Sequence, residues 1–158
     1  MAINTAWGEI KVSIGTPGTG DTMSTTLVDI GYILQDSISV EKSDGTAYEL
    51  RASGGTLVDQ MQSDPTFKIN LTLIGIEKAK QFWKMNTGKP TAVDSFVNTN
   101  KYSVLMASQV VGSDTFEAPV CTISGSPVFT EKEGWTVPLV ITVLKGAAGY
   151  LFNFGKVA

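Results

Sequence analysis

The sequence has no histidine and a single cysteine, Cys121, and these absences exclude much of the usual site chemistry. Histidine is the commonest general base and the commonest metal ligand in proteins, so a Ser-His-Asp or Cys-His nucleophile system is excluded. One cysteine cannot form a disulfide within the chain, and a lone cysteine is most often a buried small side chain. These absences do not exclude catalysis by carboxylates or lysines.

Charge is scarce as well, and no apolar run is long. Charged residues make up 17% of the 158 residues, the net charge is −3, and 42% of the residues are hydrophobic. The most apolar segment, 137–144, is far shorter than the roughly 20 residues of a membrane-spanning helix, and the N-terminus lacks the basic and apolar regions of a secretory signal. A chain with a net negative charge has no overall electrostatic attraction for nucleic-acid phosphates. We expect one soluble, cytoplasmic domain over residues 1–158.

Alternation of apolar and polar residues is the dominant pattern, and it predicts a mainly β protein, an antiparallel β-sandwich or half-open barrel. Residues 16–26 are rich in Gly, Ser and Thr without an apolar period, which predicts a long loop. Residues 37–52 are expected to form a hairpin with Asp44-Gly45 at its turn, where Gly can supply a positive φ. The alternating segments are 8–15, 27–34, 67–74, 101–108, 135–146 and, more briefly, 150–154.

One stretch changes its period. After Gly75, apolar residues recur at three- and four-residue spacing, with lysines between them, and this pattern is typical of an amphipathic helix. Pro90, just beyond Gly88, is a stop signal. The sequence therefore predicts one flanking α-helix near residues 76–86, packed through Ile76, Ala79, Phe82 and Trp83.

No motif predicts a catalytic residue, a cofactor or a metal. The glycine-rich segment 15–20 resembles a phosphate-binding loop, but it lacks the Lys-Ser/Thr that a Walker loop carries after its last glycine. Turns at 43–46 and 112–115 each hold one carboxylate, too few for a calcium site. The other carboxylates are scattered singly, although a pair formed across strands stays open. A binding or assembly module is favoured, and an enzyme is the least favoured class.

The order of these features along the chain carries a resemblance. The strand GEIKVSIG leads through a loop to LVDIGYILQDSISVEK, and the turn SGGTLVD precedes FKINLTLIG and the expected helix. The chain closes on EGWTVPLVITVLKG and YLFNFG. In this layout, over nearly the whole chain, it resembles the major tail tube proteins of tailed bacteriophages and prophages.

The resemblance implies a tail-tube-like β domain with one flanking helix, which self-associates into six-membered rings that stack into a hollow tube. The inner strands of neighbouring subunits would join around a channel through which DNA passes, and long loops would bridge to the next subunit or ring. Other tail proteins would be partners. The implied location is the virion tail, and the host cytoplasm during assembly, with no membrane.

A channel that DNA must traverse without adhering would carry repeated negative charge. On this reasoning the candidate lumen-facing acids are Asp29, Asp36, Glu41, Glu49 and Asp59. The alternative is that these acids only solubilise the outer surface.

Several other functions stay open. One is another phage tail or head-tail component, such as a tail-completion or head-decoration protein. Tube proteins of contractile injection systems and type VI secretion share the implied fold. A stand-alone β-sandwich that binds sugar or protein belongs to a different class, and it would remain monomeric.

Overall fold

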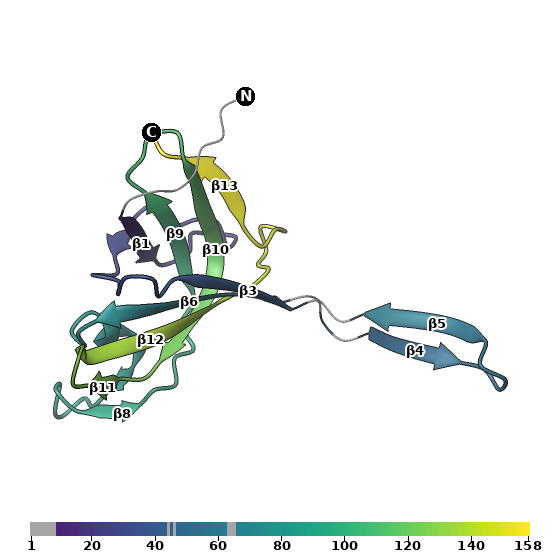
Figure 1. Ribbon diagram of the computed structural model, residues 1–158, viewed down its shortest axis with the longest axis horizontal. Coiled ribbons are helices and arrows are strands. Elements are labelled where there is room, and N and C mark those ends of the chain that lie inside the picture. Colours follow the sequence, from purple (N-terminus) through teal and green to yellow (C-terminus); the bar gives the residue numbers. More distant parts are fainter. Residues whose placement is uncertain (1–8, 44, 46, 63–65) are drawn as a thin grey trace.

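A large antiparallel sheet forms the body of the molecule in the computed structural model, which describes residues 9–43, 45, 47–62 and 66–158 (Figure 1). The prediction of a mainly β fold is confirmed. The sheet has nine strands in the order β2-β1-β9-β10-β12-β6-β3, with β11 added beside β12 and β13 beside β10. Its strands are β1 (Ile10–Gly15), β2 (Val28–Asp29), β3 (Ser39–Ser43), β6 (Thr66–Ile74), β9 (Tyr102–Ser108), β10 (Asp114–Gly125), β11 (Val128–Thr130), β12 (Gly134–Val143) and β13 (Asn153–Lys156).

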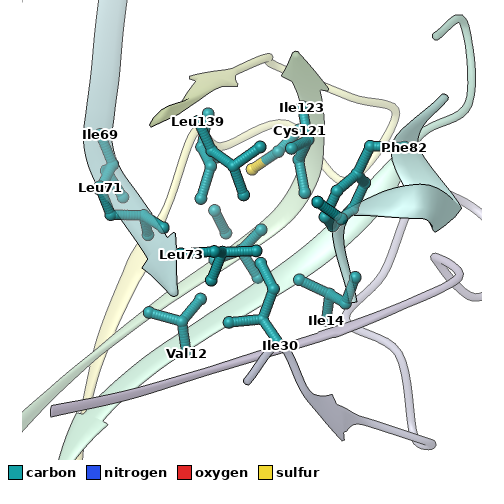
Figure 2. Close-up of a cluster of buried hydrophobic side chains, with 14 of the residues drawn as sticks. Val12, Ile14, Ile30, Ile69, Leu71, Leu73, Phe82, Cys121, Ile123 and Leu139 are labelled. Carbon is teal, nitrogen blue, oxygen red and sulfur yellow. The ribbon is translucent and has the colours of Figure 1, made fainter. Parts of the chain in front are cut away.

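Buried and more exposed residues alternate along most of β6 and β12, and the buried apolar ones belong to the core. Leu71 pairs in register with Leu139, and Ile69 with Ile141, so their side chains share one face of the sheet. All four are 2% exposed or less, and burying each such side chain stabilises the fold by roughly 1.5–3 kcal/mol. Figure 2 shows this cluster, in which residues from β1, β6, β10 and β12 converge with Phe82.

The sheet curls around this core. The register of β10 with β9 shifts between Ala118 and Cys121, and Pro119, which has no backbone donor, lies within the shift. Segment 30–34 then links the two sides of the sheet. Ile30 N donates to Val12 O of β1, and Leu34 N donates to Thr72 O of β6, both at 2.8 Å. The body is therefore a partly closed barrel.

The predicted α-helix at 76–86 is wrong. Only a four-residue 3₁₀ turn, η1 (Ala79–Phe82), forms, and Trp83 is already extended. The next residues enter a short strand pair, β7 (Lys84–Met85) and β8 (Val93–Ser95). A short helix gains few hydrogen bonds against its nucleation cost, and here the Trp83 indole N–H donates 2.8 Å to Gly125 O, which fixes this residue against the body.

The residues expected to face inward from this segment do so. Ala79, Phe82 and Trp83 are buried, and Ile76 packs partly buried against the core. Ala79 and Phe82 lie on the single 3₁₀ turn, where positions i and i+3 share a face. The three-residue spacing therefore identified the buried side chains but not the length of the helix.

The predicted hairpin over 37–52 is wrong as well. β3 pairs with β6, whereas β4 (Ala47–Arg51) pairs with β5 (Leu57–Gln62). The turn lies at Gly54 and Gly55, whose φ values are 91° and 89°, a conformation that glycine adopts at little cost. Ala52 N closes the turn by donating 2.8 Å to Thr56 O. The expected turn position Asp44 lies outside the described residues.

Candidate functional site

Few residues in the part of the chain that the structure describes could act as a nucleophile or bind a metal ion. Within it, no group of three or more Cys, Asp or Glu residues could hold a metal ion. Cys121 is buried, and this burial raises the pKa of its thiol to about 12, so the thiolate nucleophile does not form near neutral pH. Among the described helices, none has the length and apolarity to cross a membrane.

The glycine-rich segment 15–20 follows β1 and turns back on itself through a bridge between Gly18 and Thr22. The loop that it opens is tied to the body at two points. Ser24 N donates 3.0 Å to the Ser103 hydroxyl, and Ala147 N donates 2.8 Å to the Asp21 carboxylate. No helix follows the segment, so it lacks the geometry of a phosphate-binding loop.

The five acids proposed for a channel are all exposed, but they occupy separate parts of the molecule. Asp29 lies on β2, where its carboxylate accepts a 2.9 Å bond from Gly31 N, and Asp36 lies in a turn with a φ of 61°. Glu41 lies on β3. Glu49 and Asp59 lie on β4 and β5, and Glu49 forms an ion pair with Arg51. Their assignment to a channel stays a prediction.

Glu41 lies on the outer face of the main sheet, opposite the core. It pairs in register with Lys68, which pairs with Thr142. Asn70 and Val140 form the next row of this face. The outer face is therefore built mostly from small polar side chains, with an acid and a base in adjacent strands, and it contrasts with the apolar face behind it.

β3 also forms an edge of the main sheet. All five of its residues are exposed, and within the described residues it pairs only with β6. A strand at the end of a sheet can pair with a strand of another chain. This edge is the place where the sheet could continue into a second chain.

The hairpin of β4 and β5 is the feature that sequence reasoning missed. It projects from the body in Figure 1, and no described residue outside it packs closely on its strands. Tyr48, Leu50 and Met61 are 60%, 63% and 68% exposed. Tyr48 pairs directly with Met61, and Leu50 pairs with Asp59, so these four side chains share one face. We call this set of four residues the arm face.

A groove of about 840 Å³ lies where β12 leaves the sheet. Its walls come from the ends of β6 and β12 and from segment 144–152, and among the described residues Lys145 is the only charged one in its lining. Behind it, the Phe152 ring packs 4.8 Å from Phe67 and 5.0 Å from Phe116. We call this feature the Lys145 groove.

The far wall of the groove is fixed by specific bonds. Gly149 N donates 3.1 Å to Gly146 O, which closes a turn, and Leu144 N donates 2.9 Å to Val120 O. A Cβ atom at Gly146 would lie 2.7 Å from the Asp21 side chain, so only glycine fits at this crossing with the 16–26 loop. No motif marks these residues in the sequence. The groove is formed by segments distant in the chain, and only the fold reveals it.

Comparison with known proteins does not place the chain in a family. No protein-family model matches the sequence, and no curated protein matches it.

Proposed function

We propose that this chain is a structural virion protein, a tail tube subunit that stacks in rings to form a channel for DNA passage. The observation that carries the proposal is the projecting hairpin. Its arm face holds three large apolar side chains that no described part of the chain covers. Such an arm would give a polymerising subunit a surface with which to contact its neighbours.

The hairpin lacks packing partners within the described chain, and this is expected to make it only weakly stable. A two-stranded hairpin is only marginally stable in water without further strands or packing. Contiguous exposed apolar residues mark sites of interaction with other proteins. Burying Tyr48, Leu50 and Met61 against a neighbour would supply the missing stabilisation, so assembly is the natural state of this segment.

The open edge at β3 supports the same function. A strand from a neighbouring subunit could pair with this edge, and the sheet would then continue from subunit to subunit. The outer face of the sheet, which carries Glu41 and Lys68, would then form one surface of a ring. Small polar side chains on such a surface offer DNA phosphates few cations to bind.

One observation favours a second candidate function. The Lys145 groove has a volume within the range of about 300–1,000 Å³ that is usual for ligand pockets. A stand-alone binding module would use this groove for a small molecule or peptide and would stay monomeric. The two functions therefore differ in the behaviour of the purified protein.

Size measurement followed by electron microscopy tests the proposal. We expect the purified chain to shift from monomer to larger species as its concentration rises, and we expect negative-stain images to show rings or tubes. The matched control replaces Tyr48, Leu50 and Met61 with Ser, which keeps the length and the turn of the hairpin but removes the three apolar side chains of the arm face. A wild-type chain that stays monomeric at the highest soluble concentration contradicts the proposed function.

A further inference from the structure

The arm face combines three apolar side chains with one acid, Asp59. Leu50 and Asp59 are cross-strand partners, and the pair of Tyr48 and Met61 lies next to them. The other charges of the hairpin neutralise each other, because Glu49 and Arg51 form an ion pair at 2.7 Å. Asp59 accepts one bond, from Gln60 N, and has no cationic partner among the described residues.

The Lys145 groove has the opposite composition. It is lined by apolar residues such as Val143, Leu151 and Phe152, with one cation at its rim. Lys145 is exposed and has neither a hydrogen bond nor an ion pair within the described residues. An apolar surface with one unpaired acid and an apolar groove with one unpaired base are therefore complementary in polarity and in charge.

We propose that the arm face of one copy of this chain docks in the Lys145 groove of a second copy, with Asp59 of one chain paired to Lys145 of the other. This inference rests on the proposed function, since it requires self-assembly, and it adds which two surfaces meet. It also places Asp59 in an interface between subunits rather than in the channel.

Charge distinguishes this groove from the other exposed aromatic surface. Phe129 and Trp135 pack 5.3 Å apart, and both are more than half exposed. The adjoining turn carries Glu131 and Glu133 with only Lys132 between them. Its net negative charge would repel Asp59, whereas Lys145 attracts it.

The arm and the groove are different surfaces, and this fixes the symmetry of the contact. When surface A of one copy binds surface B of the next, each copy retains a free arm and a free groove for further copies. Such a contact builds closed rings or open filaments. A two-fold dimer, in which both copies use the same patch, does not follow from it.

Charge reversal tests the pairing. We expect Asp59→Lys and Lys145→Glu each to raise the concentration needed for assembly by at least about tenfold, because like charges then meet in the interface. The double variant Asp59→Lys with Lys145→Glu restores opposite charges and is expected to assemble near the wild-type concentration. Glu49→Lys and Lys132→Glu are the matched controls. They reverse a charge on the same hairpin and on the body, away from the proposed contact, and assembly is expected to persist in both.

Crosslinking gives a second readout that does not depend on rescue. A chain carrying Asp59→Cys is mixed with a chain carrying Lys145→Cys, and a short bismaleimide is added. We expect a crosslinked pair containing one chain of each kind, while buried Cys121 stays unlabelled. Circular dichroism and thermal melting of each variant confirm that the body is folded.

The outcomes separate the two proposals. Assembly of the wild type without rescue in the double variant and without crosslinked pairs overturns the arm-to-groove contact and leaves the proposed function standing. A wild-type chain that never assembles contradicts both. Rescue together with heterotypic crosslinks supports both.

Discussion

The strands of the body and the strands of the projecting hairpin carry similar side chains, yet they end in opposite environments. Leu71 on β6 and Leu139 on β12 are 2% and 1% exposed, whereas Leu50 on β4 is 63% exposed. β6 is covered because other strands of the same chain pair beside it and pack across its inner face. Alternation therefore specifies a strand with an apolar face, but it does not say whether the surface that covers this face belongs to the same chain.

Replacing one leucine with alanine in each region is expected to give the largest difference in the free energy of unfolding between the body and the hairpin. Leu139→Ala removes a fully buried side chain and leaves a cavity, so we expect it to lower the free energy of unfolding by about 2–5 kcal/mol. Leu50→Ala is the matched control in the hairpin. Its expected cost in the monomer is within about 0.5 kcal/mol, since the side chain is already in water. Chemical denaturation of the two variants provides the measurement. Equal losses in the free energy of unfolding would show that the two leucines are buried to a similar extent.

Alkaline pH is expected to destabilise the body through Cys121. The pKa of this thiol is raised from its ordinary value near 9 to about 12 by burial. Between these values the unfolded chain loses the proton and the folded chain keeps it, so rising pH favours unfolding. Full stability is present below about pH 9, and the expected loss approaches about 1.4 kcal/mol per pH unit above it.

The control for this prediction is Cys121→Ala, measured over the same pH range. The substitution lowers stability at every pH because it removes packed volume, but it also removes the ionisable group. We expect the wild type to lose stability more steeply than the variant above about pH 9. Parallel curves would show that the thiol does not contribute to the alkaline loss.

Trp83→Phe tests how the segment after η1 is held. The change keeps an aromatic ring but removes the indole N–H that donates to Gly125 O. Leaving that acceptor without its partner is expected to cost about 1–3 kcal/mol. Trp135→Phe is the matched control, because Trp135 is 53% exposed and no hydrogen bond of its indole is present among the described residues. Equal stability of both variants would show that the indole hydrogen bond does not stabilise the fold.

Removing the three apolar side chains of the arm face is expected to have the smallest effect on the monomer. The triple variant with Tyr48, Leu50 and Met61 changed to Ser should differ from the wild type by less than about 1 kcal/mol in thermal or chemical unfolding. The same variant is expected to lose assembly. A large loss of monomer stability would show that the hairpin packs on its own body.

The sequence predicts the positions of strands in the body correctly. It does not predict features that depend on contacts between distant residues. Alternation located β1, β6, β9 and β12 because the period of a strand is written in its own residues. The sequence misassigns the pairing of β4 because it offers two glycine-containing turns. Gly45, Gly54 and Gly55 all have positive φ, so the local preference of glycine does not distinguish the two turns. The 76–86 helix was overestimated because a spacing of three fits a 3₁₀ turn equally well over one repeat.

The candidate site was less predictable than the fold. The five acids were chosen for lying on polar faces of early strands, but only the pairing of those strands shows that Glu41 lies on the main sheet and Asp59 on the hairpin. No sequence pattern identifies Lys145, because the groove around it also needs Thr66 and residues 149–152, which meet it only in the folded chain. Sequence patterns identify a face, whereas complementary surfaces require the topology.

Amide hydrogen exchange in the free and the assembled protein tests the central claim most directly. The amides of β4 and β5 are followed against those of β6 and β12, which serve as an internal reference within the core. In the monomer we expect the hairpin amides to exchange rapidly while the reference amides are protected, because a hairpin without packing opens at little cost. In assembled material, the hairpin amides are expected to become protected as well. Hairpin exchange that is equally fast in both states would contradict the account.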